Sequence, residues 1–237
     1  MPFVQSPTDM KALVVADGDV HPAVPVALHA PSGDTHARPL VVAADGGARK
    51  AELLGLLPDV VVGDMDSLAP ETLAGLERRG VELQRHSPEK EASDTELAVQ
   101  EALRRGATEL VILGALGGTR FEHTLANVLL LTLPDLAGRN VALVDGPTTV
   151  RAIGSSGPDR LELDGQPGDL VSLLPLTAHV EGVTTTGLAY ALSGETLEQG
   201  TSRGLSNLLD DQQATIATSI GRLAIVHTRR AEAVAGG

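Results

Sequence analysis

The chain has 237 residues, 42% of them hydrophobic, which is enough to build the core of one large domain or two modest ones. Its formal net charge of −13 disfavours binding to nucleic acids and to anionic membranes, and the lack of cysteine excludes disulfides, thiolate nucleophiles and cysteine-bound zinc. The chain contains two phenylalanines, one tyrosine and no tryptophan, which excludes a row of stacking aromatics for single-stranded nucleic acid. Since it also lacks an apolar run of about 18 residues and a signal peptide, we expect a soluble, cytoplasmic protein without a nucleic-acid or membrane partner.

Short apolar runs alternate with segments of helical periodicity over the first 150 residues. The predicted strands are Ala12–Ala16, Leu40–Ala44, Val60–Val62, Leu110–Leu113 and Val141–Val144, and the clearest predicted helices are Pro70–Arg79, Thr95–Arg105 and His123–Leu133. Continuous apolar strands are typical of a parallel sheet that is buried on both faces by helices. Gly80 and Gly106 each follow two arginines, a pattern that predicts left-handed caps at helix ends. The segment Val20–Arg38, rich in Pro, His and Gly, is predicted to be a loop.

The pattern changes after Asp145, where Gly and Thr become frequent and helical periodicity fades. The predicted strands are now Arg160–Leu163, Leu170–Leu174, Val180–Thr185, Ala214–Ile220 and Leu223–Thr228. These runs predict a smaller antiparallel β-sandwich. The turn at Gly146-Pro147 places the predicted boundary, so residues 1–146 form an α/β domain and residues 147–237 a β domain.

Acidic residues follow two of the predicted parallel strands. Asp45 follows Leu40–Ala44, and both Asp64 and Asp66 follow Val60–Val62, while Asp94 begins a predicted helix. Ligands of open parallel sheets bind at the carboxyl ends of the strands. Two carboxylates about 6 Å apart repel each other by roughly 2.8 kcal/mol at an effective dielectric constant of about 20, so a cluster favours a bound cation. Oxygen-only ligands suit Mg²⁺, which indicates a metal-dependent phosphate-transfer site.

Each of these acids also has a purely structural interpretation. Asp-Gly after a strand is a common turn, and Ser67 and Ser93 are plausible helix caps. Ser93 and Glu96 have the spacing of a capping box, which would make Asp94 an ordinary acid of a first helical turn. The metal site is favoured because three such segments fall at equivalent places.

A glycine-rich segment from Gly114 to His123 lies between a predicted strand and a predicted helix. Such a turn at a helix N-terminus can bind an anion, and Arg120 adds a cation whose fork matches phosphate oxygens. The segment lacks the Lys-Ser/Thr ending of a Walker A loop and is a poor dinucleotide fingerprint. For His123, a structural role at the helix start is an equal alternative to a functional one.

Taken in order, these motifs resemble the thiamine pyrophosphokinase (thiamine diphosphokinase) family. The resemblance runs from about Leu40 to Thr228 and rests on five segments. They are Asp45-Gly46-Gly47, Gly63 to Ser67, Lys90 to Asp94, Gly117 to Asn127, and Ser202 to Asn207. It implies a Rossmann-like α/β domain with helices on both faces of its sheet, followed by a β-sandwich. It also implies transfer of a diphosphate from ATP to thiamine, which yields thiamine diphosphate and AMP.

The resemblance also implies roles for individual residues. Asp45, Asp64, Asp66 and Asp94 match the catalytic acids that bind Mg²⁺; Lys90, Gly117, Gly118, Arg120 and His123 match positions on the ATP phosphates; Ser206 and Asn207 match positions that hold thiamine. Residues 1–146 would then be the ATP- and Mg²⁺-binding catalytic domain and residues 147–237 the thiamine-binding domain. The family works as a homodimer in which thiamine lies between the first domain of one chain and the second domain of the other.

The chain departs from the family pattern at several positions. Glu91, Ser93 and Glu122 replace Asp, Thr and Asp, and Thr119 adds one residue before Arg120. An acid and an aromatic are missing after Asn207, and some members stack thiamine on a tryptophan, whereas Tyr190 is the only aromatic residue of this second domain. Two alternatives stay open: a diphosphokinase that acts on another alcohol, such as a hydroxymethylpterin, and a catalytically silent nucleotide or metal sensor.

Overall fold

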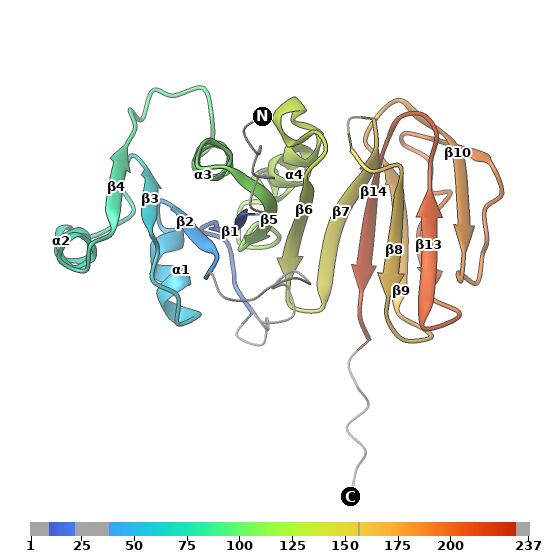
Figure 1. Ribbon diagram of the computed structural model, residues 1–237, viewed down its shortest axis with the longest axis horizontal. Helices are drawn as coiled ribbons and strands as arrows, with labels where there is room; N and C mark the ends of the chain where they lie inside the picture. The colour runs from blue at the N-terminus through green and yellow to red at the C-terminus, as the bar shows by residue number, and fades with distance from the viewer. Residues whose placement is uncertain (1–9, 22–37, 156, 231–237) are drawn as a thin grey trace, which may run out of the picture. The chain divides into compact units, whose positions relative to one another are not determined.

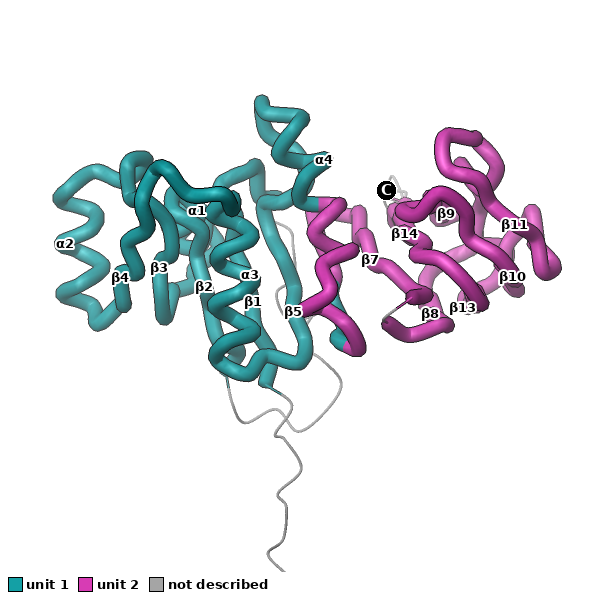
Figure 2. Tube along the Cα trace, turned by 90° about the horizontal axis from the view of Figure 1, so that it is seen from above, with its two compact units in different colours: residues 1–127, 139–141 teal, residues 128–138, 142–237 magenta. Residues whose placement is uncertain are grey.

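A computed structural model describes residues 10–21, 38–155 and 157–230 of the chain (Figure 1). These residues divide into two compact units, each with its own core (Figure 2). Unit 1 comprises residues 1–127 and 139–141, and unit 2 comprises residues 128–138 and 142–237. Residues 22–37 of the predicted loop lie outside the described residues.

Unit 1 contains a parallel sheet. Its strands are β1 (Met10–Val15), β2 (Leu40–Ala44), β3 (Val60–Gly63), β4 (Glu82–Arg85) and β5 (Ala107–Leu113). They lie in the order β5-β1-β2-β3-β4, and every neighbouring pair is parallel. The apolar runs therefore predicted four of these strands correctly. β4 was not predicted because its sequence, Glu-Leu-Gln-Arg, is polar, as suits a strand at the end of the strand order.

The helices follow the strands as crossovers. They are α1 (Gly47–Leu53), α2 (Pro70–Arg78), α3 (Asp94–Arg104) and α4 (Phe121–Leu129), and α4 is followed by the short 3₁₀ helices η2 (Leu130–Thr132) and η3 (Pro134–Leu136). The prediction of one helix from His123 to Leu133 is corrected, since the α-helix begins earlier and gives way to 3₁₀ turns. Gly80 and Gly106 have φ angles of +84° and +95°, which confirms the predicted left-handed caps.

Helices cover both faces of this sheet. Alternate strand residues, including Val15, Val41 and Val61, pack against α1 and α2 in two apolar clusters. Residues of the opposite parity, such as Val14 and Val42, are also fully buried, and α3 lies against β1, β2 and β3. This arrangement confirms the predicted α/β class and its doubly covered parallel sheet.

Unit 2 is a β-sandwich. One layer has the order β6-β7-β14-β9-β12, formed by β6 (Asn140–Asp145), β7 (Thr148–Gly154), β14 (Arg222–Thr228), β9 (Leu170–Pro175) and β12 (Asn207–Leu208). The other has the order β11-β10-β13-β8, formed by β11 (Glu195–Glu198), β10 (His179–Thr186), β13 (Gln213–Ala217) and β8 (Arg160–Asp164). Both layers are antiparallel. A single apolar cluster draws residues from both, including Leu173, Val183, Ile216 and Leu223, which confirms the predicted sandwich.

The turn at Gly146-Pro147 joins β6 to β7 in a hairpin, since Asp145 pairs with Thr148. Pairing with β7 places residues 142–145 of β6 in unit 2. A boundary between folding domains at residue 146 stays a prediction.

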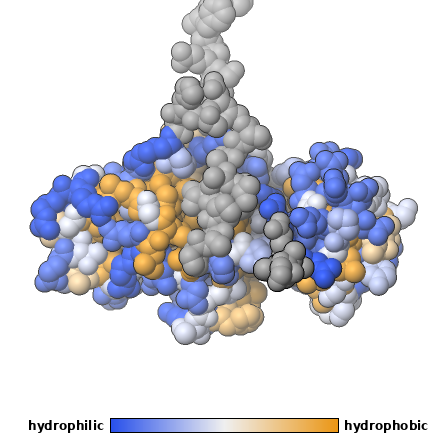
Figure 3. Space-filling model, turned by 90° about the horizontal axis from the view of Figure 1, so that it is seen from below, coloured by the Kyte–Doolittle hydropathy of each residue, from blue (hydrophilic) through white to orange (hydrophobic). Residues whose placement is uncertain are grey.

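Among the described residues, none of the helices combines the length and the apolar character needed to cross a lipid bilayer. The face of the molecule in Figure 3 carries hydrophobic areas interspersed with hydrophilic ones, as is normal for a globular protein. Three exposed apolar side chains of α4, however, are regularly spaced. Phe121, Leu125 and Leu129 of α4 are 75%, 50% and 46% exposed and are spaced four residues apart, so they form a stripe along one side of the helix.

Candidate active site

Asp45 is held at the carboxyl end of β2 by a tight turn. Its φ angle of +44° is uncommon for a residue other than glycine, and its N–H donates to the carbonyl of Val62 at 2.9 Å. Helix α1 begins two residues later at Gly47, where a Cβ atom would lie 2.0 Å from the carbonyl oxygen of Val15. Only glycine therefore lets the chain turn this close to β1, and the turn leaves Asp45 only 7% exposed beside the end of β3.

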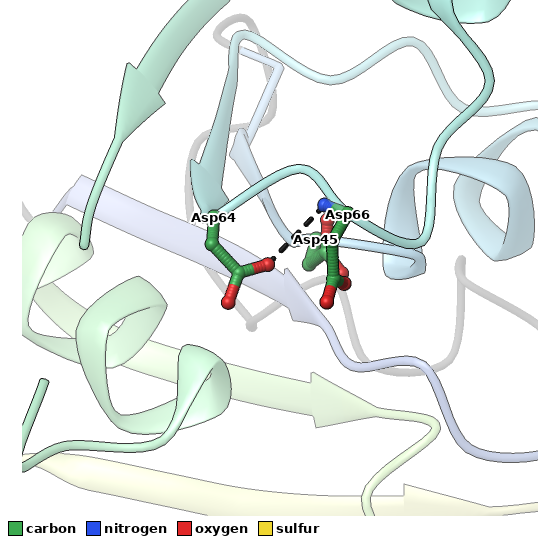
Figure 4. A group of neighbouring side chains, drawn as sticks. All are labelled: Asp45, Asp64 and Asp66. Carbon is green, nitrogen blue, oxygen red and sulfur yellow. Dashed lines mark hydrogen bonds between the residues drawn. The ribbon is translucent and has the colours of Figure 1, made fainter. Parts of the chain in front are cut away.

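Asp64 and Asp66 lie on the turn that follows β3. Between them, Met65 has a φ angle of +66° and buries its side chain in the apolar cluster with Leu73 and Leu76 of α2. This anchor points the two acids away from the core, and the N–H of Asp66 donates to Oδ1 of Asp64 at 3.2 Å. One carboxylate oxygen from each of Asp45, Asp64 and Asp66 lies within 4.8 Å of the others (Figure 4). The predicted juxtaposition of these three acids is therefore present in the structure.

Asp94 reaches the same place from α3. Oγ of Ser93 accepts the N–H of Glu96 at 3.2 Å, so Ser93 is the predicted N-cap and Asp94 is the first residue of the helix. A Cβ atom on Gly63 would lie 2.8 Å from Cβ of Asp45 and 3.0 Å from Oδ1 of Asp94, so both acids pack against this glycine at the end of β3. The capping role and a place in the acid cluster are thus compatible.

Lys90 contacts the acid cluster directly. Its Nζ atom lies 3.2 Å from Oδ2 of Asp64 and 2.8 Å from Oδ1 of Asp94. The Lys90 side chain is only 15% exposed, and the two carboxylates raise its pKa against the opposing effect of burial. In this structure Lys90 is therefore a counter-ion of the acids, and its role toward phosphate remains a prediction.

The pKa values of Asp64 and Asp66 are shifted in opposite directions. The N–H of Asp66, together with Lys90, holds the pKa of Asp64 below its usual value of 3.8. The negative charge of Asp64, followed by those of Asp45 and Asp94, raises the pKa of Asp66. In the part of the chain that the structure describes, Oδ1 of Asp45 is buried and has no hydrogen-bond partner. A buried anionic oxygen without a partner, facing two further carboxylates, fits a hard cation such as Mg²⁺.

The glycine-rich segment lies after β5, which is a neighbour of β1 in the sheet. Gly117 and Gly118 are exposed and have φ angles of +111° and +89°, and the N–H of Gly117 donates to Oγ1 of Thr124 at 3.1 Å. Nε of Arg120 lies 2.7 Å from Oε1 of Glu122, and both side chains are about two-thirds exposed. His123 is exposed in the first turn of α4. The binding of phosphate by Gly117, Gly118, Arg120 and His123 stays a prediction.

The sequence reasoning missed a third acidic turn, Asp17-Gly18-Asp19, which follows β1. A Cβ atom on Gly46 would lie 2.5 Å from the Asp17 carboxylate, which places Asp17 beside the turn of Asp45. Asp17 also lies 4.0 Å from Nη2 of Arg49, whose Nη1 donates to the carbonyl of Ser67 at 2.7 Å. The signal was available, because Asp-Gly directly follows the apolar run Ala12–Ala16, as it does at Asp45.

The proposed cap at Ser67 is wrong. Helix α2 begins after Ala69, which makes no side-chain cap, and Oγ of Ser67 is buried without a hydrogen-bond partner among the described residues. The cause is Pro70 at the start of α2, which begins the helix without a side-chain cap.

Ser206 and Asn207 belong to unit 2. Ser206 has a φ angle of +54°, and its N–H donates to Oγ of Ser172 at 3.1 Å. Asn207 begins β12 and is only 3% exposed. Its amide bonds to the backbone of Tyr190, and Tyr190 and Asn207 both line a cavity of about 140 Å³.

Comparisons with known proteins match two segments of the chain to two domains of one family. The family described as "Thiamin pyrophosphokinase, catalytic domain" matches residues 35–143, and "Thiamin pyrophosphokinase, vitamin B1 binding domain" matches residues 160–223.

Among individual proteins, the chain is 26% identical over 246 residues to thiamine pyrophosphokinase 2 of Oryza sativa subsp. japonica, covering 94% of this chain and 88% of that protein. A crystal structure of a thiamin pyrophosphokinase family protein from Enterococcus faecalis superposes with a TM-score of 0.75 at 27% identity, covering 93% of this chain and 100% of the other. The thiamine pyrophosphokinase of Bacillus subtilis has the same fold, with a TM-score of 0.78 at 21% identity over 93% and 100% of the two chains. Both halves of the sequence and the whole fold therefore agree, and the chain belongs to the thiamin pyrophosphokinase family.

Proposed function

We propose that this chain is a thiamine diphosphokinase, which transfers a diphosphate from ATP to thiamine and releases AMP. The observation that carries the proposal is the set of three carboxylates from the ends of β2 and β3, with oxygens within 4.8 Å of one another, in a chain of this family. ATP is an anion and so is the site, so the two can only meet when a cation lies between them.

Asp45, Asp64, Asp66 and Asp94 are the residues that would hold Mg²⁺. The buried Oδ1 of Asp45 and the raised pKa of Asp66, caused by its acidic neighbours, both indicate an unbalanced negative charge in this cluster. Mg²⁺ held there would supply positive charge to the phosphate oxygens and to the leaving oxygen of AMP.

In the reaction, the hydroxyl oxygen of thiamine bonds to the β-phosphorus of ATP while the bond from that phosphorus to the oxygen of AMP breaks. The proton of the hydroxyl passes to a carboxylate of the cluster. Lys90, already 3.2 Å from Asp64, holds this acid in place and offers a cation to the diphosphate. We further propose that Gly117, Gly118, Arg120 and His123 contact the ATP phosphates, since exposed glycines and a forked cation suit an anion.

The decisive experiment incubates the purified chain with ATP, Mg²⁺ and thiamine and detects thiamine diphosphate and AMP by mass spectrometry. Formation of both supports the proposal. AMP release only with another alcohol, such as a hydroxymethylpterin, would indicate the related diphosphokinase. Binding of nucleotide without AMP release under all these conditions would indicate a silent sensor.

We also propose that the chain acts as a homodimer. The support from the structure is the exposed apolar stripe of α4, formed by Phe121, Leu125 and Leu129, since an ordered apolar stripe of this kind often marks an interface. If each site needs the acids of one chain and the second domain of the other, and if Asp64→Asn and Asn207→Ala are each nearly inactive alone, the two variants should complement each other. Co-refolding equal amounts gives about half mixed dimers, each with one intact site of two, so roughly a quarter of the wild-type activity should return. No recovery in proven mixed dimers would rule out the shared site.

A further inference from the structure

Arg49 contacts two of the turns around the acid cluster and lies on the helix that begins in a third. It is the third residue of α1, which follows Asp45 and the turn after β2. Its Nη1 atom donates to the carbonyl of Ser67 at 2.7 Å, on the turn after β3. Its Nη2 atom lies 4.0 Å from Oδ1 of Asp17, on the turn after β1. One guanidinium group therefore links the turns at the carboxyl ends of β1, β2 and β3.

The bond to Ser67 holds a turn that has few backbone hydrogen bonds of its own. Within the described residues, no backbone–backbone hydrogen bond ties residues 64–68 to another segment of the chain. Burial of Met65 anchors the turn in the apolar core. Arg49 adds a charge-assisted hydrogen bond to the turn's backbone, one residue after Asp66.

The turns that Arg49 links carry acids that repel one another. Oxygens of Asp45, Asp64 and Asp66 lie within 4.8 Å of one another, and their repulsion favours separation of the turns after β2 and β3. Arg49 opposes this separation, because its backbone belongs to the helix that follows Asp45 whereas its side chain bonds to the turn of Asp66. The spacing of the acids therefore depends on Arg49.

A contribution to global stability does not account for the position of Arg49. Its side chain is 50% exposed and that of Asp17 is 48% exposed, and an ion pair with this exposure contributes little in water. A cation in the first turn of a helix also opposes the helix dipole, which favours acids there. Arg49 is thus unfavourable for α1 but well placed to control the geometry of the acids.

We propose that Arg49 is a positioning residue that sets the spacing between Asp45 and the turn of Asp64 and Asp66, and thereby favours Mg²⁺ over larger divalent cations. Mg²⁺ needs oxygen ligands at about 2.1 Å in a nearly octahedral arrangement, whereas Ca²⁺ accepts ligands at about 2.3–2.6 Å in irregular geometry. An acid cluster whose turns can separate loses affinity for the smaller ion first. The inference rests on the proposed function for the presence of a metal site.

Metal binding to the nucleotide-free protein tests this role without turnover. Electron paramagnetic resonance measures Mn²⁺ bound to the chain, and its displacement by Mg²⁺ or Ca²⁺ gives the dissociation constant of each ion. Arg49→Met loses the charge and the hydrogen bonds, and it should raise the dissociation constant about tenfold for Mg²⁺ and less than about twofold for Ca²⁺. Arg49→Lys keeps the charge but loses the fork, so the increase for Mg²⁺ should be only about threefold.

Arg79→Met is the matched control. The Arg79 side chain is also 50% exposed, and it forms an ion pair with Glu52 of α1 rather than with a turn of the acid cluster. The control should leave both dissociation constants unchanged, and in EDTA the two Met variants should melt at similar temperatures. If Arg49→Met melts far below the control and binds both ions equally weakly, Arg49 has a merely structural role and the inference is overturned.

Steady-state kinetics give a second readout. The Mg²⁺ concentration for half-maximal activity should rise about tenfold in Arg49→Met, whereas kcat at saturating Mg²⁺ and the KM for thiamine should stay within about twofold. A lower kcat that Mg²⁺ cannot restore would contradict a role through the metal site. Arg49→Gln is the second variant if Arg49→Met does not fold, and the same results are expected for it.

The outcomes distinguish this inference from the proposed function. An active wild type with an unchanged Mg²⁺ affinity in Arg49→Met overturns the inference and leaves the function intact. A wild type that makes no thiamine diphosphate contradicts the function, and a selective loss of Mg²⁺ affinity in Arg49→Met would then still support the inference. A wild type that binds neither Mn²⁺ nor Mg²⁺ overturns the metal site and, with it, the role of Arg49.

Discussion

Unit 1 contains two groups of acidic residues, and their negative charge is compensated by neighbouring side chains in one group but not in the other. Glu101 on α3 is 6% exposed, and its carboxylate is bonded by Nε of Arg104 at 2.7 Å, by Arg105, and by Nε2 of Gln84 at 2.9 Å. The hydrogen bonds from Arg104, followed by those of Arg105 and Gln84, lower the pKa of Glu101 from 4.5 to about 2. Asp66, by contrast, faces Asp64, Asp45 and Asp94, and their charges raise its pKa.

We attribute the compensated group around Glu101 to the stability of the fold and the uncompensated group to function. The charge of Glu101 is compensated within the chain, and the contacts of Glu101 with Gln84 and of Arg105 with Glu82 tie the C-terminal part of α3 to β4. At the other cluster, Lys90 forms ion pairs with Asp64 and Asp94, whereas Oδ1 of Asp45 has no hydrogen-bond partner within the described ranges. A protein retains such a cluster when a ligand supplies the missing charge, because the repulsion otherwise destabilises the fold.

Removing one charge from the uncompensated acid cluster should reduce turnover strongly. Asp64→Asn and Asp66→Asn keep the size of the side chain, and each should lower turnover by at least two orders of magnitude, about 2.7 kcal/mol of transition-state stabilisation. The circular dichroism spectrum should be unchanged. Near-normal activity of Asp64→Asn at saturating Mg²⁺ would reject the assignment.

Removing the charge of Glu101 should lower the stability of the fold and leave turnover unchanged. Glu101→Gln should lower the free energy of unfolding by about 2 kcal/mol, since the pKa shift is large but Arg104 is 65% exposed and its charge is screened. Turnover per folded molecule should stay near the wild-type value. A large loss of turnover without a loss of stability would contradict this contrast.

The pH dependence has a definite sign for Glu101. Its folded pKa lies below the unfolded value, so its contribution is fully present above about pH 4.5 and is lost as the pH falls toward about 2. Urea unfolding between these two pH values should show this loss in the wild type. The slope should be smaller in Glu101→Gln.

Binding of Mg²⁺ should stabilise the fold by a smaller amount, which depends on the Mg²⁺ concentration. Mg²⁺ at ten times its dissociation constant should stabilise the wild type by about 1.4 kcal/mol, measured as a rise in melting temperature. In EDTA, Asp66→Asn should melt at or above the temperature of the wild type, because one repelling charge is gone, and Mg²⁺ should then stabilise it less. Equal Mg²⁺ shifts in both proteins would show that the ion binds elsewhere.

The smallest expected effect concerns Arg120. Arg120→Lys keeps the charge but loses the planar fork, so the KM for ATP should rise by a few-fold, on the order of 1 kcal/mol. Its ion pair with Glu122 is about two-thirds exposed and contributes little to stability, so the melting temperature should barely change. If the melting temperature falls sharply and the KM for ATP stays constant, the residue has a structural role instead.

Much of the fold was predictable because local patterns carry it. Apolar runs marked four of the five strands of the parallel sheet, and Gly80 and Gly106 marked two helix ends, since burial on both faces and a positive φ angle each restrict which residues a position accepts. β4 and the two-residue β12 escaped because pairing with a neighbouring strand, rather than their own sequences, makes them strands.

The acids of unit 1 could be identified without a structure, since Asp45, Asp64, Asp66 and Asp94 each lie near a glycine or a helix cap at the end of an element. Which side chains contact one another, however, depends on how the chain folds. Burial of Met65 orients Asp64 and Asp66 away from the core. Lys90 forms ion pairs with both Asp64 and Asp94, and Asp17 packs against Gly46. The hydrogen bonds of Asn207 to Tyr190, 17 residues away, could not be predicted from the sequence either. The reason is that side-chain hydrogen bonds and charge pairing depend on positions in space, whereas periodicity along the chain records only which residues are buried.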